Sequence, residues 1–106
     1  MPISDDLANR VRRCVAKRSG LSERRMFGCL GFFLHGNLAC GVHDDELIVR
    51  VNPDSVEPLL KEPHTRRFDL SGRPMKGWLL VKVADTAALS RWVNRGITYA
   101  ATFPRK

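Results

Sequence analysis

Apolar residues near the start of the chain recur at every third or fourth position, which is the period of one face of an α-helix. The residues of this stripe are Leu7, Val11, Cys14 and Val15. Ser4 precedes the stripe with a side chain that can cap a helix, and Gly20 follows it, as glycine often follows a helix end. The pattern predicts an amphipathic helix over residues 4–18.

Between residues 23 and 52 the pattern changes to short strands separated by turn signals, and in the last of them Leu47, Val49 and Val51 share one face while Ile48 and Arg50 share the other. His35-Gly36-Asn37 and Asp44-Asp45 are turn-forming groups that separate the apolar runs. Because short turns join neighbouring strands, these segments should form an antiparallel meander. The predicted strands are 24–27, 30–34, 38–42 and 46–51.

The second half of the chain predicts two more helices and two more strands. Asn52-Pro53 is a typical helix start, with Asn as the cap and Pro at the first position, and Pro63 ends this short helix. Asp85 caps a final helix, which ends before Pro104. The strands between these helices are predicted at 65–68 and 78–83.

The predicted order is α-β-β-β-β-α-β-β-α, an α+β fold in which helices pack on a small single-layer antiparallel sheet. Gly96 lies in the apolar stripe of the last helix, where glycine costs about 1 kcal/mol relative to alanine, so we expect close packing there. The periodicities place a common set of residues in one core: Leu7, Val11, Val15, Leu47, Val49, Leu89, Trp92, Val93 and Ile97.

The composition is that of an ordinary globular domain. The chain has 106 residues, of which 43% are hydrophobic and 27% are charged, so we expect one domain over residues 1–106. No apolar run approaches the ~20 residues that span a bilayer, and the acidic N-terminus does not resemble a signal peptide. Three cysteines cannot pair fully within one chain, which agrees with a cytoplasmic protein.

Two glycine-rich segments, around Gly28 and Gly77, set large apolar side chains between glycines and lack the spacing of a phosphate loop. Together with the strands they resemble the N-terminal domain of the TfoX/Sxy competence regulators over residues 7–103. The residues that carry the resemblance are Met26-Phe27-Gly28, Gly31-Phe32-Phe33, Gly36-Asn37-Leu38, Cys40-Gly41-Val42, Leu47-Ile48-Val49-Arg50-Val51, Phe68, Met75-Lys76-Gly77-Trp78, Leu89 and Trp92-Val93.

The resemblance implies a small bacterial α+β domain with a regulatory role. In the full-length regulators this domain precedes a helical C-terminal domain and helps to switch on competence genes alongside the cyclic-AMP receptor protein. Because the sequence ends at Lys106, we expect a stand-alone version without that second domain. The motif residues expected to be structural are Met26, Phe27, Gly28, Gly31, Gly36, Gly77, Trp78 and Trp92.

Candidate chemistry is sparse. His35, Cys40 and His43 are a legitimate zinc-ligand set, but alternating strand faces separate them and a fourth ligand is missing. The acidic turn at 43–46 lacks the ligand spacing of a calcium loop, and no base is placed to activate Cys29. We therefore expect no catalytic residue, no metal and no cofactor, and a protein that is not an enzyme.

The charge is the strongest hint about partners. The formal net charge is +7 and the pI is about 10.0, which favours acidic partners or nucleic acid. The candidate contact residues are Arg10, Arg13, Lys17, Arg24, Arg25, Arg66, Arg67, Arg73 and Lys76.

The sequence favours a non-enzymatic regulatory or protein-interaction module that binds a protein partner. Direct nucleic-acid binding through the basic surface is one alternative, and a small-molecule or catalytic pocket is another. We expect nucleic-acid binding to be weak and sensitive to salt. A homodimer is a further hypothesis, with Met26–Phe33 as the candidate open sheet edge.

Overall fold

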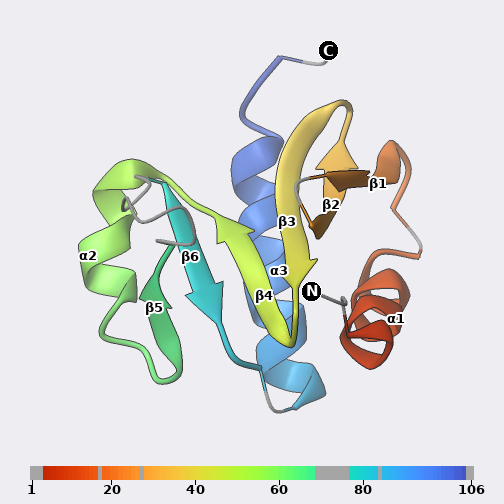
Figure 1. Ribbon diagram of the computed structural model, residues 1–106. Helices are drawn as coiled ribbons and strands as arrows, with labels where there is room; N and C mark the ends of the chain where they lie inside the picture. Colours follow the sequence, from red (N-terminus) through yellow and green to blue (C-terminus); the bar gives the residue numbers. More distant parts are fainter. Residues whose placement is uncertain (1–3, 17, 27, 69–76, 84, 105–106) are drawn as a thin grey trace.

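The computed structural model describes residues 4–16, 18–26, 28–68, 77–83 and 85–104. The elements follow the predicted order (Figure 1). They are α1 (Asp5–Val15), β1 (Leu21–Met26), β2 (Cys29–Leu34), β3 (Asn37–His43), β4 (Glu46–Arg50), the 3₁₀ turn η1 (Pro53–Ser55), α2 (Val56–Leu59), β5 (Thr65–Arg67), β6 (Trp78–Val81) and α3 (Thr86–Ala100).

The six strands form one antiparallel sheet in the order β1-β2-β3-β4-β6-β5. The predicted turns are confirmed. His35 and Gly36 both have positive φ between the paired residues Leu34 and Asn37, as in a two-residue hairpin. Asp44 also has positive φ and reverses the chain between β3 and β4.

Three sequence predictions differ from the structure. α1 ends at Val15, three residues earlier than predicted, and β1 begins at Leu21, three residues earlier than predicted. The expected open edge at Met26–Phe33 is wrong, because β2 pairs with β1 on one side and with β3 on the other. Within the described sheet the outer strands are β1 and β5.

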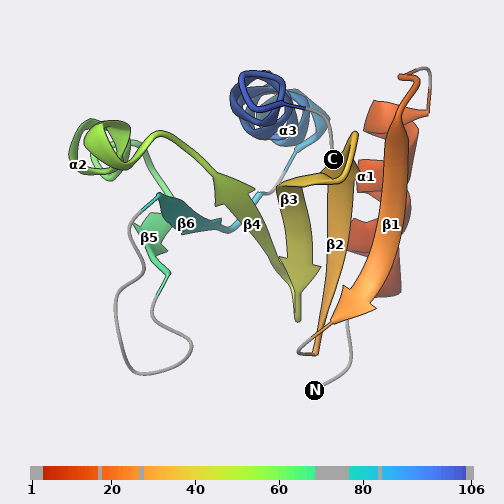
Figure 2. The ribbon, with the colours of Figure 1, turned by 90° about the horizontal axis from the view of Figure 1, so that it is seen from above.

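The core lies between the sheet and the helices α1 and α3, and α3 runs across one face of the sheet (Figure 2). All nine residues predicted to share a core belong to it, so this prediction is confirmed. The opposite face carries a second set of buried residues, which alternate with the core residues along their strands: Phe33, Ile48 and Leu80. Among the described elements, no helix covers that face (Figure 2).

The expected close packing at Gly96 is also confirmed. The register between β2 and β3 shifts after Phe32, which pairs with Cys40, whereas Phe33 pairs with Leu38. Ala39 is therefore the extra residue of a bulge. A Cβ atom on Gly96 would lie 2.3 Å from the carbonyl oxygen of Ala39, so only glycine lets α3 pack against this bulge.

Candidate binding cleft

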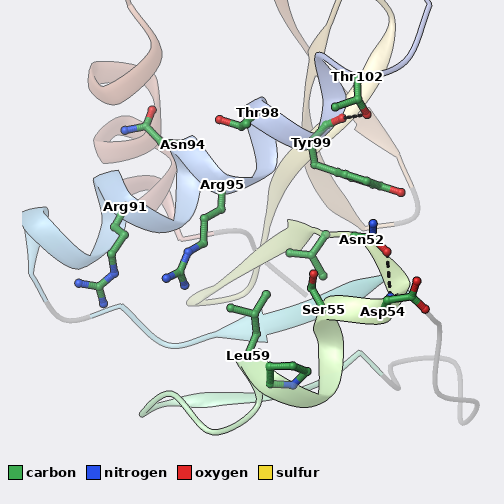
Figure 3. Close-up of a pocket in the computed structure, with 12 residues that line it drawn as sticks. Asn52, Asp54, Ser55, Leu59, Arg91, Asn94, Arg95, Thr98, Tyr99 and Thr102 are labelled. Carbon is green, nitrogen blue, oxygen red and sulfur yellow. Dashed lines mark hydrogen bonds between the residues drawn. The ribbon is translucent and has the colours of Figure 1, made fainter.

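A cleft of about 710 Å³ lies between α3 and the segment that contains η1 and α2 (Figure 3). The buried residues of α3 face the sheet, and the opposite side of the helix forms one wall of the cleft. The side chains of this wall recur at helical spacing. They are Arg91, Asn94, Arg95, Thr98, Tyr99 and Thr102.

Local hydrogen bonds hold the second wall in place. The side chain of Asn52 accepts a hydrogen bond of 2.9 Å from the backbone N–H of Asp54, which caps η1 as the sequence predicts. The Thr65 hydroxyl contacts the carbonyls that end α2, the shortest distance being 2.8 Å to Glu62. The apolar lining of this wall consists of Val51, Pro58 and Leu59.

Gly77, the residue before β6, supports the same wall. Its carbonyl accepts a hydrogen bond of 2.9 Å from the N–H of Val51. Gly77 has a φ of +84°, and a Cβ atom there would lie 3.1 Å from the carbonyl oxygen of Val51. Both the left-handed backbone and this close approach favour glycine, which agrees with the structural role expected of the motif.

Two arginines at one end of the cleft share a single carboxylate. Arg95 Nη1 lies 2.7 Å from Glu62 Oε2, and Arg91 Nη2 lies 3.8 Å from Glu62 Oε1. The guanidinium of Arg95 also lies 4.5 Å from the centre of the Trp92 ring. These side chains are partly exposed, and ion pairs of this kind contribute about 0.2–1 kcal/mol. Another carboxylate can therefore replace Glu62 as the partner of Arg91 and Arg95 at little cost in free energy.

Aromatic rings gather at the other end of α3, around Arg50. Its guanidinium carbon lies 4.5 Å from the centre of the Phe103 ring, 5.6 Å from that of Trp78 and 5.9 Å from that of Tyr99. Tyr99 and Phe103 meet edge to face, with ring centres 5.1 Å apart. Within the described residues no acidic side chain forms an ion pair with Arg50. In the sequence Arg50 stands out only as part of the family motif, because its ring partners lie far along the chain, in β6, in α3 and after α3.

Several polar groups of the cleft have no partner within the described residues. They are the hydroxyls of Ser55, Thr98 and Tyr99 and the carboxylate of Asp54. No histidine or cysteine is among the described residues that line the cleft. A ligand could contact the apolar floor of the cleft, formed by Val51, Pro58 and Leu59, and the polar groups around it.

The predicted basic residues that lie in the described part of the chain do not form one patch. Arg24 and Arg25 are successive residues of β1 and therefore lie on opposite faces of the sheet. Arg24 lies 4.9 Å from the centre of the Phe33 ring, on the face away from the helices. Arg10 lies 4.0 Å from Asp6 on α1, where Arg13 is exposed.

The predicted basic residues of the second half are divided in the same way. Arg66 pairs with Glu46 at 2.6 Å, and Arg67 pairs with Glu57 of α2. Because Arg66 and Arg67 are successive residues of β5, they too lie on opposite faces of the sheet. Lys17, Arg73 and Lys76 lie outside the described residues. Contact of these residues with nucleic acid or an acidic partner stays a prediction.

The candidate metal set is spread along β3. His35 lies in the turn before β3 and His43 at its far end, with Cys40 in the core between them. Burial raises the pKa of the Cys40 thiol to about 12, and burial also raises the pKa of Cys29. Among the described residues no group of three potential ligands could hold a metal ion.

The motif residues that the structure describes lie at turns, strands and the core. Gly28 and Gly36 have positive φ, and Gly31 leaves room for the ring of Phe33. Trp78 is half-buried, with its ring centre 6.0 Å from that of Phe68, and Trp92 is buried in the core. The side chain of Met26 and the whole of Phe27 lie outside the described part.

These features define an α+β domain in which helices pack on one face of an antiparallel sheet and a binding cleft follows one helix. The chain belongs to the TfoX N-terminal domain family, whose model matches residues 13–100, so the resemblance found in the sequence is confirmed. This family is not a known enzyme family. Comparison with curated proteins and with solved structures gave no match.

No helix in the described segments is both long enough and apolar enough to cross a membrane.

Proposed function

We propose that this protein is a non-enzymatic regulatory module that binds a protein partner in the cleft between α3 and the η1–α2 segment. One observation carries the proposal: the cleft joins an apolar floor to polar groups that the described residues leave without partners. Because these groups reach solvent, a ligand can replace the water that they bind with its own donors and acceptors. Membership of the TfoX N-terminal domain family supports the regulatory role.

Direct nucleic-acid binding has weaker support. Recognition of a phosphate backbone needs several cations on one surface, and the described arginines of β1 and β5 point to both sides of the sheet. The net charge of +7 supports only weak binding that decreases steeply with salt. The three cysteines of the chain, an odd number that cannot all pair within it, support a cytoplasmic location.

Site-specific photo-crosslinking in the source cells tests the proposed function. A benzoylphenylalanine residue in place of Thr98, which is exposed on the cleft wall, should crosslink to a defined protein partner. The matched control replaces Ser22, which is exposed on the outer strand β1 and does not line the cleft, and should not capture that partner. The proposed function is wrong if Thr98 yields no protein adduct or only the adducts of Ser22.

A further inference from the structure

We infer that the cleft takes an acidic peptide segment, whose carboxylate pairs with Arg91 and Arg95 in place of Glu62. This inference rests on the proposed function, because it names the chemistry of the partner that the same cleft would bind. It rests on three observations: the charge at the Arg91 end, the length and lining of the cleft, and the internal carboxylate that already occupies the arginines.

Positive charge is in excess at the Arg91 end of the cleft. Arg91 and Arg95 share the single carboxylate of Glu62, at 3.8 and 2.7 Å. Arg18 adds a third cation beside α3, where its Nη2 donates a hydrogen bond of 3.2 Å to the side-chain oxygen of Asn94, which points away from Arg91 and Arg95 (Figure 3). Within the described residues no acidic side chain forms an ion pair with Arg18. An incoming carboxylate would therefore find unneutralised guanidinium groups, which bind carboxylates in a bidentate geometry.

The opposite end of the cleft differs in charge. Asp54 lies there, beyond Tyr99 and Asn52, while Arg91 and Arg95 extend from the other end of α3 toward Leu59 (Figure 3). The electrostatic gradient along the cleft therefore orients a ligand, with its acidic group toward the arginines. A ligand that is acidic along its whole length would meet Asp54 at the far end.

The dimensions of the cleft match a short extended peptide. Its α3 wall runs from Arg91 to Thr102, which is about 16 Å at the rise of an α-helix. An extended chain covers that length with about five residues. The apolar floor of Val51, Pro58 and Leu59 can take an apolar side chain. The free hydroxyls of Ser55 and Thr98 can bond to the peptide backbone, which has a donor and an acceptor at every residue.

Glu62 then acts as an internal competitor for the acidic group. It follows α2 at the edge of the second wall and is itself partly exposed, so a peptide carboxylate can replace it without burying an unpaired charge. The inference therefore predicts the direction in which the loss of Glu62 changes the affinity for an acidic peptide. Loss of the Glu62 charge should strengthen binding of an acidic peptide, whereas loss of a merely structural ion pair would weaken it or leave it unchanged.

Fluorescence anisotropy with a fluorescein-labelled Glu-Leu-Leu-Ser-Asn peptide tests the inference, with a Gln-Leu-Leu-Ser-Asn peptide for comparison. Arg95→Ala should weaken binding of the glutamate peptide by about tenfold or more, the loss expected for a charge-assisted hydrogen bond. Glu62→Gln should strengthen it several-fold and leave the glutamine peptide unaffected. Arg12→Ala is the matched control, because it removes the same charge and a comparable ion pair, 2.7 Å to Glu23, from an exposed site on α1, and it should change binding by less than about twofold.

The inference is overturned by a failure of the glutamate peptide to bind at millimolar concentration, by equal losses in Arg95→Ala and Arg12→Ala, or by weaker binding in Glu62→Gln. Tighter binding of a single-stranded oligonucleotide with the same dependence on Arg95 would also overturn it, in favour of nucleic acid. Because Glu62→Gln is a gain-of-affinity variant, misfolding cannot mimic the expected result. If the peptide fails but Thr98 still crosslinks to a protein, this inference is wrong and the proposed function stands. If both fail, both are wrong.

Discussion

Gly96 of α3 lies directly against the carbonyl oxygen of Ala39, the bulged residue of β3. A Cβ atom on Gly96 would stand 2.3 Å from that oxygen. Backbone atoms on both sides of the contact leave no flexible side chain to move aside. The contact therefore sets how closely α3 approaches the sheet, and with it the position of the α3 wall of the cleft.

Gly96→Ala should destabilise the protein, by about 1–3 kcal/mol in the free energy of unfolding, because α3 must shift away from the bulge. The sign is informative, since alanine is the better helix former and would stabilise an uncrowded position by about 1 kcal/mol. Urea denaturation measures the change. Thr98→Ala, an exposed control on the same helix, should stay within about 0.5 kcal/mol of the parent. A Gly96→Ala variant as stable as the parent would contradict the packing described.

Trp92→Ala should lower the free energy of unfolding by about 3–5 kcal/mol, because it removes one of the largest buried side chains of the core. It also removes the ring beneath the Arg95 guanidinium. Calorimetry and urea denaturation measure the loss. Trp92→Phe keeps part of the volume and should lose less. An unchanged denaturation midpoint in Trp92→Ala would show that the core does not depend on this residue.

The contact between Arg50 and Phe103 should be measurable as a coupling energy. Cation–π contacts contribute about 0.5–1 kcal/mol at exposed sites and more when desolvated. A double-mutant cycle with Arg50→Ala, Phe103→Ala and the double variant should give a favourable coupling of that size. A cycle between Arg50 and Phe33, whose ring is contacted by Arg24 instead, serves as the control. Additive losses in the first cycle would mean that the two side chains do not interact.

Glu23 should make stability depend on pH on the acid side. Hydrogen bonding to Arg12, at 2.7 Å, lowers the pKa of Glu23 below its usual value of 4.5. A lowered folded-state pKa contributes stability above the unfolded value, and this contribution is lost as the pH falls below about 4.5. Urea midpoints of the parent and Glu23→Gln should therefore differ at pH 6 and converge at acid pH. A difference independent of pH would rule out this ion pair as its cause.

Cys40 should resist alkylation in the folded protein. Burial raises the pKa of its thiol to about 12, so the reactive thiolate is scarce at pH 8. Iodoacetamide followed by mass spectrometry should label Cys14 and Cys29, which are half-buried, before Cys40. In urea all three should react at similar rates. Rapid labelling of Cys40 under native conditions would show that the core opens readily at β3.

Local sequence patterns were enough to predict the order of the helices and strands and the residues that form the core. The stripe from Leu7 to Val15 and that from Leu89 to Ala100 are local periodicities, so they mark the buried helix faces whatever the helices pack against. The same holds for the turns, because His35-Gly36 and Asp44-Asp45 act through their own backbone conformations. Family membership also followed from residues that the sequence displays directly.

The edges of the sheet, the cleft and the distribution of charge depend on contacts between segments that are distant in the chain, so they became visible only in the folded structure. The pairing of β6 between β4 and β5 joins segments that are distant in the chain, and no local pattern encodes it. The same long-range packing brings Glu62 to Arg91 and Arg95, and Phe103 to Arg50. Adjacent arginines such as Arg24 and Arg25 form a cluster in the sequence, yet alternation along a strand places their side chains on opposite faces. Local periodicity shows which side of each element is buried, but it does not show which elements meet.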